Sequence, residues 1–219
     1  MWLILPALLV YTMFMLVPLV ASLGLSLFSW TGYGAKSFVG LSNFVRLFTE
    51  YPYNERFWNA LGNNVYFFAI TMVVQNLVAL ILATLLTRGL KGSTALRTLF
   101  FAPSTVSVVI VGFIGVLIFN PMWGGLNAFL RAAGLSSWAK PWLGSESTAL
   151  TAIAIANAWQ YTGIPMMLFI AGINAIPADQ YEAVAVDGGS EWHKFAYITL
   201  PNLKPIIFVV STMTFVGNF

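Results

Sequence analysis

Long apolar segments without a charged side chain constrain this sequence more than any other feature. Five such segments stand out, at residues 2–28, 65–86, 98–119, 150–176 and 205–219. The hydrocarbon core of a bilayer requires about 20 mainly apolar residues per spanning helix, and the segments reach or approach that length. Only 8% of the 219 residues are charged, whereas soluble domains carry roughly 25%. The sequence therefore predicts an all-α membrane protein, with residues 1–219 forming one transmembrane domain in a lipid bilayer.

The outermost segments bear on where the chain begins and ends. Segment 2–28 has no basic residue before it and is too long for the apolar region of a signal peptide. We therefore expect it to be a retained helix. Segment 205–219 reaches the last residue without a charged flank. We therefore expect the chain to be truncated at its C-terminus, with the rest of the fifth helix missing.

The connections between the segments differ in their density of basic charge. Connection 87–97 contains Arg88, Lys91 and Arg97, and the fourth connection contains Lys194 and Lys204. Because cytoplasmic loops are enriched in Lys and Arg, we predict that these two connections and the N-terminus lie on the cytoplasmic side of the membrane. The net charge of +3 comes without the basic cluster that nucleic-acid binding requires, so no nucleic-acid partner is expected.

The first connection, residues 31–62, is the longest and would lie outside the cell. Within it, residues 38–48 combine apolar positions at helical spacing with polar ones. Ser42 is a candidate N-cap, because a serine hydroxyl can accept a hydrogen bond from the first free N–H groups of a helix. This stretch therefore predicts a short amphipathic helix at the outer membrane interface.

Composition excludes several kinds of site. The chain has no cysteine, which rules out disulfides, thiolate metal sites and a cysteine nucleophile. Its one histidine, His193, lies in a connection, where a plain surface contact is the expected role. No glycine loop of the Walker type is present. We therefore expect a chain that is not an enzyme, has no catalytic residue and binds no metal or cofactor; any ATP and Mg²⁺ would be bound by a separate ATPase chain.

Residues 177–201, within the fourth connection, have the most specific local pattern. A proline followed by Asp179 suits a helix start, and Gly188 with its neighbouring glycine suits a helix end. Ser190 can then cap a second helix that leads to Pro201. Such a helix, bend and helix could dock into a cleft on a partner, or could simply join two membrane spans.

A family resemblance favours docking. Glu182, Ala183 and Val184, then Gly188, then residues 198–201 (Ile-Thr-Leu-Pro) resemble the EAA signature of permease subunits in binding-protein-dependent ABC importers. That signature places Glu-Ala-Ala, Gly and Ile-x-Leu-Pro at these spacings, and only Val184 departs from it, replacing the second alanine. Further stretches resemble the carbohydrate-uptake branch, whose members take up sugars or glycerol phosphate. They are residues 5–6, 38–44, 97–103, 120–131, 159–160 and 171–177.

The resemblance implies a fold, a mechanism and partners. The fold would be a type I ABC importer transmembrane domain, with five helices present of a six-helix core. Residues 177–201 would be the cytoplasmic coupling loop, driven by an ABC ATPase dimer. A second homologous permease would complete the path, and an extracytoplasmic solute-binding protein would deliver the solute. The coupling residues implied by the signature are Tyr181, Glu182, Ala183, Asp187, Gly188, Leu200 and Pro201.

Polar residues inside the spans are candidates for the solute path, because polar groups are costly in a membrane. The resemblance implies a path lined by the last four core helices. It favours Ser104, Asn157, Gln160, Tyr161 and Asn218. For each of them, hydrogen bonding between helices is the competing role. Gln75 and Asn76 are expected to serve packing instead.

Two other functions compete with an ATP-driven importer. A secondary transporter, driven by an ion gradient, is expected to carry Asp, Glu or Arg inside its spans. A membrane-embedded enzyme would require clustered titratable groups. The five segments contain no such residue, which disfavours both.

Overall fold

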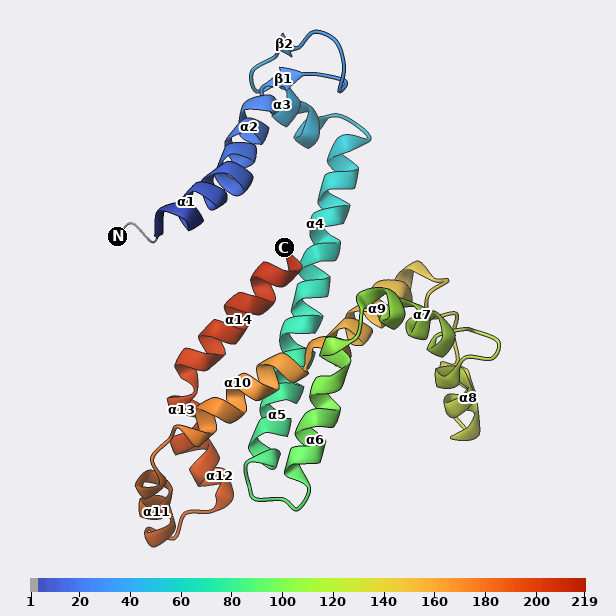
Figure 1. Cartoon of the computed structure of the whole chain (residues 1–219). Helices are drawn as coiled ribbons and strands as arrows, with labels where there is room; N and C mark the ends of the chain where they lie inside the picture. The colour runs from blue at the N-terminus through green and yellow to red at the C-terminus, as the bar shows by residue number, and fades with distance from the viewer. Residues whose placement is uncertain (1–3) are drawn as a thin grey trace. The chain divides into compact units, whose positions relative to one another are not determined.

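The computed structural model describes residues 4–219, so the first two residues of the predicted 2–28 span lie outside the described part. The described chain is mainly helical (Figure 1). Two compact units are present, Met1–Gly62 and Asn63–Phe219. Within residues 4–219, two continuous helices and three bent helix pairs are long and apolar enough to cross a bilayer. They correspond to the five predicted segments.

The first unit begins with a helix of 21 residues, Leu5–Leu25. It consists of α1 (Leu5–Tyr11), a π-helical turn η2 (Thr12–Leu16) and α2 (Val17–Leu25). A short antiparallel pair follows, β1 (Phe28–Ser29) with β2 (Ser37–Phe38).

The predicted amphipathic helix exists as α3 (Ser42–Thr49). Its N-cap is Leu41, and no side chain caps the helix; the prediction that Ser42 is the cap was therefore wrong by one residue. Instead, the Asn43 amide nitrogen donates hydrogen bonds to the carbonyls of Ser26 and Phe28, at 2.9 and 3.0 Å. These bonds fasten α3 to the end of the first span.

The second span is longer than predicted. Helix α4 (Tyr53–Ile70), the π-helical turn η3 (Thr71–Gln75) and α5 (Asn76–Leu86) form one helix of 34 residues. At about 1.5 Å per residue this helix is roughly 50 Å long, well beyond the ~30 Å of a hydrocarbon core. Residues 53–62 were predicted to belong to the connection. They form the first part of α4, which begins before the apolar segment.

The third and fourth spans are bent pairs. Helix α6 (Ser93–Phe101), continued by the 3₁₀ turn η4 (Ala102–Thr105), meets α7 (Val108–Ile118) at 99°. Helix α9 (Glu146–Tyr161) meets α10 (Gly163–Asn174) at 44°. Non-helical backbone at membrane depth is tolerated only where protein or a water-filled cavity surrounds it. The structure therefore corrects the prediction of one uninterrupted helix for segment 98–119.

A loop with its own hydrogen bonds joins α7 to α9. It contains α8 (Gly125–Ala132) and the 3₁₀ turn η5 (Ser136–Trp138). The buried Asn127 donates to the carbonyls of Pro121 and Lys140 and accepts from the Trp142 indole N–H at 2.8 Å. One amide thereby holds the two ends of this loop together.

The chain ends with the fourth connection and the fifth span. The connection contains α11 (Ala178–Val186), α12 (Glu191–His193), the π-helical turn η6 (Lys194–Thr199) and α13 (Leu200–Asn202). Helix α14 (Lys204–Asn218) follows at a bend of 64°.

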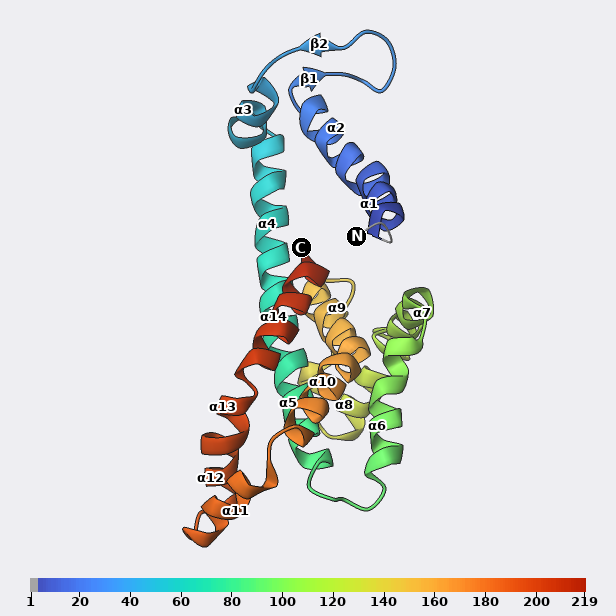
Figure 2. The same ribbon diagram turned by 60° about the vertical axis from the view of Figure 1, so that its left-hand side comes forward.

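The core of the second unit lies where α5, α10 and α14 pack together (Figures 1 and 2). Its buried side chains are Ala79, Ala83, Leu86, Met166, Phe169, Ile170, Leu203 and Val210. Gly172 on α10 leaves room for the side chains of Ile206 and Leu203, with which a Cβ at this position would collide. Small residues at such crossings let helices approach closely, which stabilises packing in a membrane.

Candidate functional site

The bend in residues 177–201 has a defined hydrogen-bond pattern. Gly188 has a φ of +75°, in the left-handed region that favours glycine. Its N–H donates to the carbonyl of Ala185 at 3.1 Å, and the Gly189 N–H donates to the carbonyl of Val184 at 2.8 Å. These two bonds form a Schellman motif, as the glycine pair predicted. A Cβ at Gly189 would meet the Val184 carbonyl oxygen at 2.8 Å, so the second glycine allows close approach.

The helix after the bend has Ser190 as its N-cap, as predicted. His193 also takes part in the capping, which was not predicted. The Ser190 N–H donates to Nδ1 of His193 at 3.2 Å, and the Ser190 hydroxyl lies 2.7 Å from the same nitrogen. His193 was expected to be a plain surface residue. It is exposed, as expected, and it also closes the helix start from the third position, where Glu or Gln usually completes a capping box.

Charged side chains link this loop to the turn between α5 and α6. Glu191 accepts a hydrogen bond from Lys194 at 2.7 Å and lies 3.9 Å from Arg88. The hydrogen bond and charge of Lys194, followed by the charge of Arg88, lower the pKa of the Glu191 carboxyl. The two connections with the densest basic charge therefore lie at the same end of the second unit (Figure 2).

The predicted coupling residues divide into an inner and an outer group. The Tyr181 hydroxyl lies 3.0 Å from the Thr199 hydroxyl and joins α11 to η6. The side chains of Glu182 and Ala183 are exposed on α11, that of Asp187 is exposed at its C-cap, and Leu200 and Pro201 are exposed on α13. Large apolar side chains are exposed on the same loop, at Val186, Trp192 and Tyr197. No sequence signal distinguished these three from core residues.

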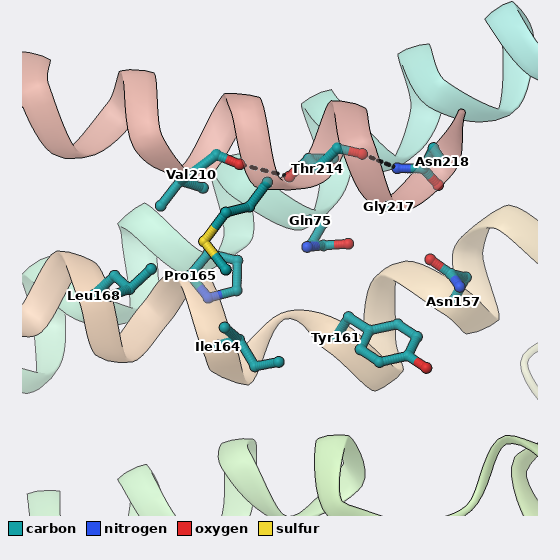
Figure 3. Close-up of a pocket in the computed structure, with 11 residues that line it drawn as sticks. Gln75, Asn157, Tyr161, Ile164, Pro165, Leu168, Val210, Thr214, Gly217 and Asn218 are labelled. Atoms are coloured by element: carbon teal, nitrogen blue, oxygen red, sulfur yellow. Dashed lines mark hydrogen bonds between the residues drawn. The ribbon is translucent and has the colours of Figure 1, made fainter. Parts of the chain in front are cut away.

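A cleft of about 390 Å³ opens between α9, α10 and α14, with η3 at its side (Figure 3). Asn157, Tyr161 and Asn218, three of the predicted solute-path residues, line it together. Gln75 and Thr214 complete its polar surface, and Ile164, Pro165, Leu168, Val210, Met213 and Gly217 complete the rest. The cleft thus combines an aromatic face and amide groups, which suit a solute with apolar faces and hydroxyls.

Two of the five predicted path residues lie outside this cleft. The Ser104 hydroxyl donates to the carbonyl of Phe101 at 2.7 Å. Gln160 is buried, and its amide nitrogen donates to the carbonyl of Val106 at 3.1 Å. Gln160 therefore satisfies a carbonyl that the break between η4 and α7 leaves without a helical partner. Asn76 was expected to serve packing. Its amide nitrogen lies 3.3 Å from the Thr214 hydroxyl and so links α5 to α14.

Comparison with known proteins identifies relatives over nearly the whole chain. Residues 75–219 match the family described as binding-protein-dependent transport system inner membrane component. A probable ABC transporter permease, YurN of Bacillus subtilis, is 38% identical over 96% of this chain and 72% of its own length. The lactose transport system permease LacF of Rhizobium radiobacter is 35% identical over 97% of this chain and 70% of its own. The trehalose/maltose transport system permease MalF of Thermococcus litoralis is 34% identical over 94% of this chain and 68% of its own length.

Solved structures show the same fold. A bacterial ABC transporter that imports the acidic polysaccharide alginate has a chain that superposes with a TM-score of 0.79 at 23% identity. That match covers 97% of this chain and 70% of the other. The same transporter in complex with a periplasmic protein bound to an alginate pentasaccharide gives a TM-score of 0.80 at 24% identity. The predicted type I importer fold is confirmed by these matches.

Proposed function

Because this chain belongs to the binding-protein-dependent inner membrane permeases of ABC importers, we propose how it is driven and what its cleft holds. It is a transport subunit for carbohydrate uptake, and we infer that it has no chemistry of its own. ATP and Mg²⁺ would be bound by a partner ATPase dimer. The membrane is a bacterial inner membrane, with the N-terminus in the cytoplasm.

The α11–α12 loop is the proposed docking element for the ATPase. Its exposed Val186, Trp192 and Tyr197 supply apolar area, and exposed Glu182 and Asp187 supply acceptors for hydrogen bonds or ion pairs. Tyr181 with Thr199, and Gln180 with Asn202, tie α11 to the following helix at 3.0 and 3.1 Å. A loop braced at two points moves as one body, so closure of the ATPases would be transmitted to the spans.

The cleft is the proposed binding site for the solute inside the membrane. Asn157, Tyr161 and Asn218 line it, and all three come from the fourth and fifth spans. Lactose, trehalose, maltose and arabino-oligosaccharides are named for relatives of this chain. We propose a solute of this carbohydrate class, delivered by an extracytoplasmic binding protein and enclosed with the help of a second permease.

An ion-gradient-driven transporter is the second candidate. It would require a titratable side chain near the solute for coupling. Among the side chains of residues 4–219 that line the cleft, none belongs to Asp, Glu, Lys, Arg or His. The ATP-driven mechanism is therefore favoured.

Purification of the complex with its neighbouring subunits tests this function. We expect an ATPase to co-purify and its ATP hydrolysis in proteoliposomes to rise several-fold when binding protein and sugar are added together. Lactose, maltose and trehalose would be tried in turn, and sugar without binding protein is the control. A complex without an ATPase, or uptake that persists without ATP in an ion gradient, would contradict the proposal.

A further inference from the structure

Gln75 lies in the cleft although its place in the sequence assigned it to packing. It is on the second span, whereas the predicted path residues are on the third, fourth and fifth. Its side chain is only 7% exposed, and it lines the same cleft as Asn157, Tyr161 and Asn218 (Figure 3).

The amide of Gln75 has no hydrogen-bond partner of its own among residues 4–219. By contrast, Gln160 donates to the Val106 carbonyl, and Asn76 lies within hydrogen-bond distance of Thr214. The Gln75 amide is not shut off inside the protein, because among residues 4–219 the buried side-chain nitrogen without a partner is Nε of Arg97. The amide is therefore open to the cleft that Gln75 lines, where it can form a hydrogen bond with the contents of the cleft. An amide that faces a cleft is explained by a polar occupant of that cleft.

The backbone at Gln75 supports the same conclusion. Gln75 is the last residue of the π-helical turn η3 (Thr71–Gln75) inside an otherwise regular helix. Single π-turns inside α-helices frequently occur at functional sites. Of the five residues of this turn, Gln75 is the one that lines the cleft. The local geometry therefore presents Gln75, rather than a neighbouring apolar residue, to the cleft.

The charge of the cleft restricts what it can hold. Its polar groups in residues 4–219 are amides and hydroxyls, from Gln75, Asn157, Tyr161, Thr214 and Asn218, with no Lys, Arg, Asp or Glu among them. A carboxylate or phosphate placed there would lose its hydration without gaining a cationic partner, which is strongly unfavourable. Amide groups, in contrast, can both donate to and accept from sugar hydroxyls.

We propose that Gln75 contacts the solute directly and that the cleft selects uncharged, polyhydroxylated solutes over acidic or phosphorylated ones. This inference rests on the proposed function, since it requires that the cleft hold the transported solute. The carbohydrate-uptake branch as a whole takes up phosphorylated and acidic compounds as well as neutral ones. The proposal restricts the range of solutes for this chain to neutral saccharides.

Cysteine labelling tests the inference, because this chain has no cysteine of its own. The Gln75→Cys variant is assembled in the complete transporter and treated with a cationic, water-soluble methanethiosulfonate reagent. The matched control is Val73→Cys, two residues away in the same turn, where the side chain is 61% exposed on the outside of the chain. A thiol reacts as the thiolate, which forms in a watery cleft and not against lipid. We expect Gln75→Cys to react roughly tenfold faster than Val73→Cys.

Protection by solute completes the test. A neutral sugar that the wild-type complex takes up should slow labelling of Gln75→Cys to roughly a tenth when it occupies the cleft in excess. Lactobionate, which differs from lactose by oxidation to a carboxylate, should not slow labelling. Equal labelling of the two variants, or protection by lactobionate as strong as by lactose, would overturn the inference.

The outcome separates this inference from the function on which it depends. Uptake of lactose, maltose and trehalose by the wild-type complex is measured in parallel. If one sugar is taken up and does not protect Gln75→Cys, the contact with Gln75 is wrong while the importer function stands. If none of them is taken up and none stimulates ATP hydrolysis, the function and this inference fail together.

Discussion

The Gly188→Asp variant is expected to lose nearly all solute uptake while inserting into the membrane in normal amounts. Gly188 has a φ of +75° at the end of α11, and a residue with a Cβ pays about 1–2 kcal/mol in the left-handed region. The new carboxylate would also stand beside Asp187 at the negative end of the helix dipole. Both effects displace the bend that positions α11 against α12. Uptake in cells, with immunoblotting of the membrane fraction, measures the result.

The same backbone motif elsewhere in the chain supplies a matched control. Gly134 ends α8 with a φ of +76°. Its N–H donates to the carbonyl of Arg131 at 3.1 Å, and the Leu135 N–H donates to that of Leu130 at 2.8 Å. A Cβ has no neighbour within 4 Å at either Gly134 or Gly188. Gly134→Asp should therefore strain its loop equally and retain most of the uptake. Equal loss in both variants would show a general folding defect and remove the special role of Gly188.

The Gly163→Ala variant is expected to destabilise the protein more than any other single methyl addition to a span. A Cβ at Gly163 would lie 2.7 Å from the Phe100 carbonyl oxygen and 2.7 Å from Cα of Phe101. These are backbone atoms, so no rotamer change can make room, unlike at Gly172, where side-chain ends would yield. Overpacking of this kind costs about 1–3 kcal/mol. The Tm of the detergent-solubilised complex should fall by roughly 5 °C.

Gly112→Ala provides the comparison for this prediction. Gly112 lies within α7, and a Cβ there has no neighbour within 4 Å. Alanine is the better helix former by about 0.8–1.0 kcal/mol, so the Tm of Gly112→Ala should be unchanged or slightly higher. A Gly163→Ala protein that is as stable as Gly112→Ala would mean that α6 and α10 do not meet at Gly163 as described.

The parts of this molecule that the sequence could predict are those set by local chemistry. Apolar length predicted five spans. The Gly188–Gly189 pair and Ser190 predicted the bend and the cap in the fourth connection, because such motifs depend only on neighbouring residues. The 99° break between η4 and α7 was not predicted, although Ser107 gives a local signal as the N-cap of α7, where its hydroxyl accepts a hydrogen bond from the Val109 N–H at 3.3 Å. The break also has a distant partner that local sequence cannot reveal, because Gln160, 54 positions away, donates a hydrogen bond to the Val106 carbonyl.

The cleft was predicted in part for a related reason. Asn157, Tyr161 and Asn218 could be found because polar residues in a span are conspicuous, yet the same criterion also selected Ser104 and Gln160. Only tertiary contacts distinguish an amide that faces a cleft from one that satisfies a carbonyl. Gln75, expected to serve packing, lines the cleft from the last position of the π-helical turn η3, and such turns have no clear sequence signal.

Helix α5 connects the two regions described above without a break. It starts directly after Gln75, at the cleft, and ends at Leu86, whose carbonyl accepts a hydrogen bond from Arg97 at 3.0 Å. Arg88 beyond it lies 3.9 Å from Glu191 in the docking loop. If solute binding at one end changes the affinity for the ATPase at the other, thermodynamic reciprocity requires ATPase docking to change solute affinity by the same factor. If solute binding raises the affinity for the ATPase, the subunit with an empty cleft would bind the ATPase more weakly than the subunit with solute bound.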